Sequence, residues 1–264
     1  MLWERPIIWA VAIGILLGLG GVYYYYTHSS EPAPAAAPAP HVQLPPAPPE
    51  PAIHNPVPTP AQPAAAQPLP TLNDSDPALH DALIAVPGAA ALEKFLVPQN
   101  IVRHIVATVD NLPRKKVALE LRPVKPIAGQ FSTVASGDSV TLSPQNAARY
   151  APFIALVKSA DAKQLAALYF HYYPLFQQSY EDLGYPGQYF NDRVIVVIDD
   201  LLAAPDPKGA IPLVQPNVTF QYADPKLESL SAGQKTLMRM GAENEAAIKE
   251  KLRALRAELA THKK

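Results

Sequence analysis

The side chains best suited to binding or catalysis gather in one stretch, "YFHYYPLFQQSYEDLGYPGQYFNDR", residues 169–193. Aromatic rings can stack against a sugar or a peptide, and the acids and amides between them can form hydrogen bonds. Glu181, Asp182 and Asp192 could also supply the two carboxylates that a glycoside hydrolase needs. The same residues are typical of an aromatic core at a helix–loop–helix corner. The pattern therefore favours a core first, a binding platform second and catalysis last.

The familiar signatures of catalysis and of metal binding are missing. The sequence contains no G-x-S-x-G, H-E-x-x-H, Walker A, G-x-G-x-x-G or S-x-x-K pattern, and it has no cysteine. Its seven histidines show no spacing of the kind that holds a metal ion. We therefore expect no catalytic residue, no metal site and no cofactor, and the sequence carries no positive sign of an enzyme.

Two corners of the chain are the candidate binding surfaces. One is Asp110–Arg114, where a helix is expected to end at a proline, and the other is the loop Tyr185–Arg193, which glycine and proline shape. The side chains that we expect to take part in binding are Asp110, Asn111, Arg114, Tyr185, Tyr189, Asn191, Asp192 and Arg193.

The charge balance argues against one class of partner. Lys and Arg together number 22, Asp and Glu number 23, and the formal net charge is −1. Domains that bind nucleic acid usually carry a basic face and a high pI. We therefore expect no nucleic-acid partner.

Residues 7–26, "IIWAVAIGILLGLGGVYYYY", contain no charged side chain. A helix of this length rises about 30 Å, the thickness of the hydrocarbon core of a bilayer. Trp9 near one end and Tyr23–Tyr26 at the other are rings of the kind that settle at membrane interfaces. Arg5 precedes the segment, which by the positive-inside rule places residues 1–6 in the cytoplasm. The sequence predicts a single-pass anchor in the bacterial inner membrane, with a cleaved signal peptide as the alternative.

The stretch that follows, residues 27–72, has the composition of a spacer. It holds 15 of the 31 prolines and only two charged residues, Glu31 and Glu50. Such a segment buries too little apolar surface to fold, and proline biases it toward an extended polyproline II conformation. We expect a disordered Pro/Ala-rich linker that carries residues 73–264 into the periplasm.

Residues 73–264 contain clear helix and turn signals. Capping residues and apolar spacing predict helices that start at the N-cap Asp76, within "PQNIVRHIVATVDNLP", at Ser143–Pro144, at the N-cap Asp161, within "QYFNDRVIVVIDDLLAAP", at Asp224–Pro225 and within "AENEAAIKEKLRALRAEL". The last helix has an apolar stripe too short for a coiled coil, so we expect it to pack on the domain; the stripe is Ile248, Leu252, Leu255 and Leu259.

Two stretches have strand signals. "GQFSTVASGDSVTLS" predicts a hairpin, and "IPLVQPNVTFQY" predicts two further short strands or extended pieces. The expected fold class is mostly α (α+β): a transmembrane helix, a disordered linker, and a compact helical domain with one or two short β-hairpins.

Four motifs carry a family resemblance: "VDNLPR", "YEDLGYPGQYFNDR", "VIDDLL" and "ADPKLESLSAGQKTLMRMGAEN". From about Asn73 to about Leu259 the chain resembles the bacterial family called domain of unknown function 3014, in which a membrane anchor and a low-complexity spacer look typical. The resemblance implies no activity, ligand or catalytic residue. One departure is Ala242, where we expect proline, and it affects only the entry to a helix.

These observations favour a non-enzymatic envelope protein whose periplasmic domain binds a partner protein or the cell wall. One alternative is a hydrolase of a peptidoglycan-type envelope polymer that uses Glu181, Asp182 or Asp192. The other is a TonB-like energy-coupling protein, which has the same anchor–proline–domain layout. The predicted anchor lacks polar membrane residues and the linker lacks lysine, which disfavours energy coupling.

Overall fold

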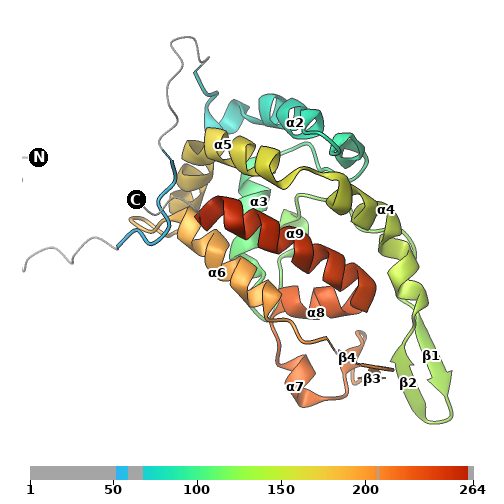
Figure 1. Ribbon diagram of the computed structural model, residues 1–264. Coiled ribbons are helices and arrows are strands. Elements are labelled where there is room, and N and C mark those ends of the chain that lie inside the picture. The colour runs from blue at the N-terminus through green and yellow to red at the C-terminus, as the bar shows by residue number, and fades with distance from the viewer. Residues whose placement is uncertain (1–51, 59–67, 207, 261–264) are drawn as a thin grey trace, which may run out of the picture. The chain divides into compact units, whose positions relative to one another are not determined.

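The computed structural model describes residues 52–58, 68–206 and 208–260 (Figure 1). Over these ranges the chain forms eight α-helices, α2–α9, and one four-stranded antiparallel sheet. The prediction of a mostly helical domain with a small β element is confirmed. No helix within these ranges is long and apolar enough to cross a bilayer, and the predicted anchor at 7–26 lies outside them.

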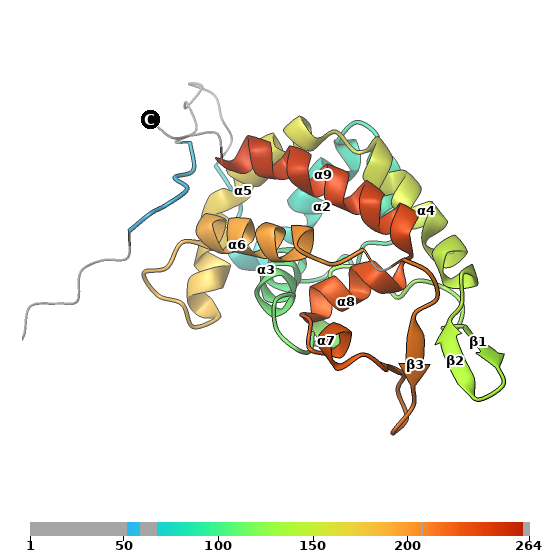
Figure 2. The same ribbon diagram turned by 60° about the horizontal axis from the view of Figure 1, so that its bottom comes forward.

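The C-terminal helix α9 (Ala242–Ala260) contacts several other helices of the domain. It packs on α4 (Gln145–Ser159), α5 (Ala162–Asp182) and α6 (Phe190–Leu202), and Figure 1 shows it running between α4 and α6. The helix α3 (Ile101–Asn111) contacts α5 and α6, as the second view makes clear (Figure 2). The corner where α5 meets α6 is thus held in place by α3 and α9, each of which contacts both helices.

The packing of α9 on the domain confirms the prediction for its apolar stripe. Ile248 and Leu252 pack against a cluster that includes Val197 and Leu237, whereas Leu259 is buried against Ile195 and its neighbours on α5 and α6. Burial of this stripe removes apolar surface from water at roughly 25 cal/mol per Å². Ile248, Leu252 and Leu255 stay partly exposed and line an apolar surface hollow of about 360 Å³.

The remaining helices are short. They are α2 (Asp76–Ala85), α7 (Pro225–Glu228), α8 (Ala232–Arg239) and the 3-10 segments Leu72–Asp74, Ala90–Lys94 and Leu119–Leu121. The predicted caps at Asp161 and Asp224 accept hydrogen bonds from backbone amides at the start of α5 and α7, at 2.7 and 2.8 Å. A reciprocal capping box of Ser231 and Gln234 begins α8, a helix that the sequence analysis does not predict.

The predicted N-cap of α2 is wrong by one residue. Ser75 occupies the cap position and Asp76 is the first residue of the helix. The carboxylate of Asp76 instead accepts hydrogen bonds from the amides of Asn100 and Ile101, at 2.6 and 2.8 Å, and so caps α3. A carboxylate is a good acceptor for the unpaired amides of any helix start within reach, and here the helix it serves is not its own.

Most of the aromatic residues between 169 and 193 belong to the core. Tyr172, Phe176, Tyr180 and Phe190 are buried in the main hydrophobic cluster, together with residues of α2 and α3. The rings of Phe176 and Phe190 stack with centroids 6.0 Å apart. The first interpretation of this stretch, an aromatic core at a helix–loop–helix corner, is confirmed.

All four strands join one sheet in the order β1-β2-β3-β4. The predicted hairpin is β1 (Thr133–Ser136) and β2 (Ser139–Leu142), with Thr133 opposite Leu142. The strands β3 (Pro212–Val214) and β4 (Gln221–Tyr222) also form, and Leu213 of β3 pairs with Val140 of β2. The sequence predicts both strand pairs, and the structure adds that they form a single sheet.

Candidate functional site

Asp110, at the end of α3, is the centre of a network of charged side chains. Its own side chain is only 4 % exposed, yet it pairs with two arginines: Arg114 at 2.5 Å and Arg193, from α6, at 3.0 Å. Arg193 also donates to the backbone carbonyl of Asp110, at 2.7 Å. The two predicted corners of the chain therefore meet, because α3 packs beside α6.

Tyr185 joins the same network from the loop between α5 and α6. Its hydroxyl accepts a hydrogen bond from Arg114 at 2.7 Å and donates one to the Asp110 carboxylate at 3.2 Å. Its ring stacks on Tyr180 with the centroids 4.6 Å apart. The loop can turn back in this way because Gly184 has a φ of 111°, a conformation that side chains with a Cβ rarely adopt.

The charges of the network act on one another. The negative charge of Asp110, and after it the electrostatic interaction with Tyr185, raises the pKa of the Arg114 guanidinium. Burial raises the pKa of the Tyr180 phenol. Both shifts keep the proton on Arg114 and on Tyr180 at neutral pH.

A surface hollow of about 340 Å³ lies beside this network. Its walls are His54, Asp110, Tyr180, Tyr185, Gln188, Tyr189, Asp192, Arg193 and Val196. The sequence analysis does not name Val196, which is 55 % exposed. The sequence does contain a signal for an exposed apolar residue here, because the unbroken apolar run "VIVVI" is longer than the buried face of one helix can accommodate.

The other predicted site residues have different surroundings. Asn111 donates its side-chain amide to the carbonyl of Ala107 one turn back in α3, at 2.7 Å, and it does not line the hollow. Asn191 is completely buried, whereas Asp192 is half-buried and faces a segment of the linker.

That segment, residues 52–58, runs without helix or strand against the start of α6. The backbone amides of His54 and Asn55 donate to the two oxygens of Asp192, at 3.0 and 2.7 Å. The side-chain amide of Asn55 donates to Asp192 at 2.8 Å, and Asn191 donates to the carbonyl of Asn55 at 2.9 Å. The sequence assigns these residues to the spacer and gives no signal of a contact with the domain.

The carboxylates of the hydrolase alternative take part in ordinary structural contacts. Glu181 accepts a hydrogen bond from Gln177 at 2.8 Å, and Gln177 also binds the backbone of Gln188 and Phe190. Asp182 is exposed at the end of α5. A hydrolase that uses these groups stays a prediction.

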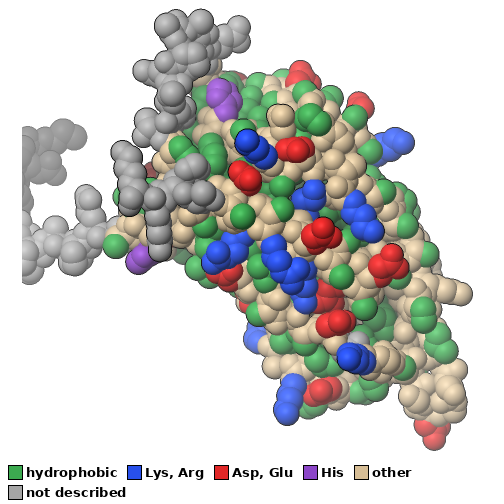
Figure 3. All heavy atoms as spheres, viewed as in Figure 1, with side chains coloured by type: hydrophobic (Ala, Val, Ile, Leu, Met, Phe, Trp, Pro, Cys, Tyr) green, Lys and Arg blue, Asp and Glu red, His purple; other side chains and the backbone are tan. Residues whose placement is uncertain are grey.

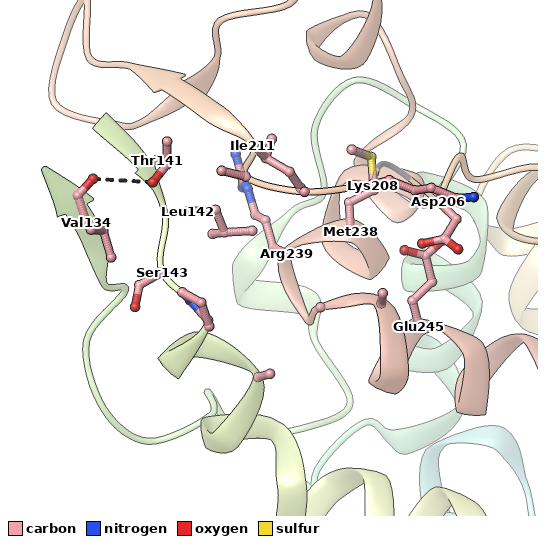
Figure 4. Close-up of a pocket in the computed structure, with 16 residues that line it drawn as sticks. Val134, Thr141, Leu142, Ser143, Asp206, Lys208, Ile211, Met238, Arg239 and Glu245 are labelled. Carbon is pink, nitrogen blue, oxygen red and sulfur yellow. Dashed lines mark hydrogen bonds between the residues drawn. The ribbon is translucent and has the colours of Figure 1, made fainter. Parts of the chain in front are cut away.

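A second hollow lies elsewhere, and the sequence analysis proposes none of its lining residues as site residues (Figure 4). It has a volume of about 700 Å³ and lies between the sheet, the start of α4 and the turn from α8 to α9. One wall is apolar, with Leu142, Ile211 and Met238. The strands of one sheet come from distant parts of the sequence, so no local pattern indicates this cavity.

One wall of this cavity carries the charged residues Asp206, Lys208, Arg239 and Glu245. Glu245 is 2 % exposed and its carboxylate lies 2.6 Å from the Lys249 ammonium. Burial raises the pKa of Glu245, and Figure 4 shows the carboxylate of Asp206 turned toward it. The Arg239 guanidinium lies 5.5 Å from the centre of the Tyr222 ring. These groups give the cavity polarity, but they form no nucleophile–base pair.

Across the described residues, no group of three or more His, Asp and Glu side chains could hold a metal ion. On the face drawn in Figure 3, basic and acidic side chains are interspersed over α6 and α9. Asp199 of α6 and Arg256 of α9 form an ion pair, joined at 2.6 and 3.0 Å.

Comparison with known families supplies the identification. A family model described as "Protein of unknown function (DUF3014)" matches residues 101–256. The chain belongs to this family. The DUF3014 region runs from the start of α3 into α9 and contains the Asp110 network, Asn191 and Asp192. It confirms the family that the sequence motifs indicate. No curated protein and no solved structure matches the chain.

Proposed function

We propose that this DUF3014 protein is a non-enzymatic interaction protein of the bacterial envelope, and that its domain binds a partner protein at the hollow beside Asp110. The observation that carries the proposal is the composition of that hollow. Tyr185, Tyr189 and Arg193 line it together with the exposed Val196. Tyrosine and arginine are the side chains that most often dominate the binding energy of protein interfaces.

Preorganisation supports this assignment. Tyr185 is held by its stack on Tyr180 and by two hydrogen bonds to the Asp110 network. A side chain that is already ordered loses little conformational entropy when a partner binds, so more of the contact energy remains as affinity. Arg193 is fixed in the same way by the carboxylate and the carbonyl of Asp110.

The proposal includes the location of the protein in the cell envelope. Residues 7–26 anchor the protein in the inner membrane with residues 1–6 in the cytoplasm, and residues 27–72 carry the domain into the periplasm. The length and apolar character of 7–26 and the proline content of 27–72 support it. A fusion of alkaline phosphatase to the C-terminus should be active, and a fluorescent C-terminal fusion should not.

The test of binding is photocrosslinking in cells that express the full chain. A photoreactive residue at Val196 should give a discrete crosslinked product that Tyr189→Ala reduces at least fivefold without lowering the melting temperature by more than about 3 °C. The control position is Val218, an apolar residue that is 91 % exposed in the connection between β3 and β4. A product equally strong from both positions, or no product from Val196, would show that the hollow is not the binding surface.

A further inference from the structure

We infer that the junction of α5 and α6 is a binding groove for an extended, proline-flanked peptide, and that His54–Pro58 of the same chain is its resident ligand. The groove shares Tyr189 and Asp192 with the hollow beside Asp110. The inference therefore deepens the proposed function and rests on it for the identity of an outside partner. The docking of the chain's own segment is tested separately.

Recognition begins with the peptide backbone. The two oxygens of Asp192 accept from two successive amides, those of His54 and Asn55, at 3.0 and 2.7 Å. Hydrogen bonds to a carboxylate are shorter and stronger than those between neutral groups. Residues 53–58 contain no lysine or arginine, so the negative charge of Asp192 is met by amides alone within this segment.

Asn55 sets the register of the peptide. Its side-chain amide donates to Asp192 at 2.8 Å, and its carbonyl accepts from Asn191 at 2.9 Å. Asn191 is completely buried, and its amide also reaches the carbonyl of Leu259 in α9, at 3.5 Å. Because Asn191 is completely buried, this donor is part of the domain interior rather than a surface group that adapts to its neighbour.

The composition of the linker makes this contact specific. Residues 27–72 contain many prolines and alanines but only one asparagine, Asn55. That single residue takes part in three of the four polar contacts between the segment and the domain, through its amide, its side chain and its carbonyl. A contact formed merely because a proline-rich chain lies close to a protein would have no reason to centre on it.

The residues after Asn55 extend into an aromatic surface. Pro56, Val57 and Pro58 line a hollow of about 320 Å³ together with groups from α5 and the start of α6: Phe170, Tyr173, Pro174 and Tyr189. Aromatic-lined grooves are a common solution for proline-rich peptides, because proline is already restricted to an extended conformation and loses little entropy on binding. The chemical class of ligand is therefore an uncharged, extended peptide with asparagine followed by alternating proline.

The first experiment measures amide hydrogen exchange in the full-length protein. The amides of His54 and Asn55 should exchange at least tenfold faster in Asp192→Ala than in the wild type, while the amides of α6 stay protected. The matched control is Asp182→Ala, which removes an exposed carboxylate close in sequence and should leave both amides unchanged. Equal exchange in the wild type and Asp192→Ala overturns the inference.

The second experiment supplies the ligand from outside. Asn55→Pro removes the amide and the side chain that dock, and it lies outside the helical core, so it should vacate the groove without unfolding the domain. A labelled synthetic peptide of residues 50–60, EPAIHNPVPTP, should bind this variant at least tenfold more tightly than it binds the wild type. The same peptide should bind the double variant Asn55→Pro/Asp192→Ala at least tenfold more weakly than it binds Asn55→Pro. A peptide with Asn55→Ala should bind Asn55→Pro at least tenfold more weakly than the unchanged peptide does.

Each other result has a definite meaning. Equal affinity for the wild type and Asn55→Pro overturns the assignment of His54–Pro58 as resident ligand. No binding to Asn55→Pro at millimolar peptide overturns the groove itself. A wild type that is dimeric where Asn55→Pro is monomeric shows that the segment docks between chains, which contradicts a resident ligand of the same chain. The crosslinks from Val196 can disappear or persist independently of all three, so failure of the proposed function is distinguishable.

Discussion

Asp110→Asn is the substitution that best tests whether the charged network holds the candidate site in shape. Asparagine keeps the size of aspartate and one acceptor oxygen, but it removes the negative charge. The side chain of Asp110 is 4 % exposed, so water cannot replace the missing charge. Each hydrogen bond to a charged partner contributes about 1.5–3 kcal/mol.

The two arginines are affected to different degrees. The side chain of Arg114 is 52 % exposed, and solvent compensates most of the weakened interaction. Arg193 is 24 % exposed and keeps its 2.7 Å bond to the carbonyl of Asp110, so only its ion pair with the carboxylate disappears. We expect a net decrease of about 2–3 kcal/mol in the free energy of unfolding, because the ion pair of Arg193 is removed and that of Arg114 is weakened. For a domain of this size that corresponds to a melting temperature lower by about 5–10 °C.

The matched control is Asp199→Asn, which breaks an aspartate–arginine pair at the surface. Asp199 and Arg256 are 49 % and 41 % exposed, although their hydrogen bonds of 2.6 and 3.0 Å are as short as those of Asp110. Exposed pairs of this kind contribute about 0–1 kcal/mol. Thermal unfolding followed by near-ultraviolet circular dichroism measures both variants. If Asp110→Asn lowers the melting temperature no more than Asp199→Asn does, the argument from burial is refuted.

Three further predictions concern the fold. Gly88→Ala should lower the free energy of unfolding by about 3 kcal/mol or more in urea titrations, because the added Cβ would lie 2.0 Å from a backbone carbonyl at the end of α4. The control is Gly209→Ala, which has a similar positive φ but no atom within 4 Å of the added Cβ and should cost only about 1 kcal/mol. Equal costs would contradict the steric explanation. Asp76→Ala should cost about 1–2 kcal/mol and raise amide exchange at the start of α3 rather than of α2, and the opposite pattern would restore its role as the cap of α2. Burial raises the pKa of Tyr173 and Tyr222 to about 12, above the ordinary value of 10.0, so the unfolded chain releases these protons first as pH rises. The free energy of unfolding should therefore keep its full value below pH 10 and fall by about 2–3 kcal/mol per tyrosine as pH rises from about 10 to about 12. Absorbance at 295 nm reports the late titration of these phenols. Phenols that all titrate near pH 10 in the folded protein would contradict the prediction.

Much of the helical part of the fold can be predicted from the sequence because its signals are local. The caps Asp161 and Asp224, the apolar stripe of α9 and the hairpin of β1 and β2 each depend on residues a few positions apart. Within such a distance the geometry of a helix or a turn determines which side chains meet. The same reasoning assigns the Val–Ile run of α6 to a helix, and that assignment is confirmed.

The candidate site is only partly local. The sequence identifies two polar corners, and the structure joins them through Arg193 and Asp110, which are 83 residues apart. It also leaves Asn111 out, because that side chain bonds to its own helix. The large cavity beside the sheet has no sequence signal at all, since it exists only where β2 pairs with β3.

Local signals in the residue sequence were sufficient for the family, the fold class and several helix starts, because capping, periodicity and motif spacing act over a few residues. Tertiary structure alone decided which carboxylate serves which partner: Asp76 caps a helix that is not its own, Asp110 holds two arginines, and Asp192 binds the linker. The physical reason is that an acidic side chain bonds to whatever donor the packing of the chain brings within about 3 Å. That distance is set by helix packing across the whole domain, and no local pattern of residues encodes it.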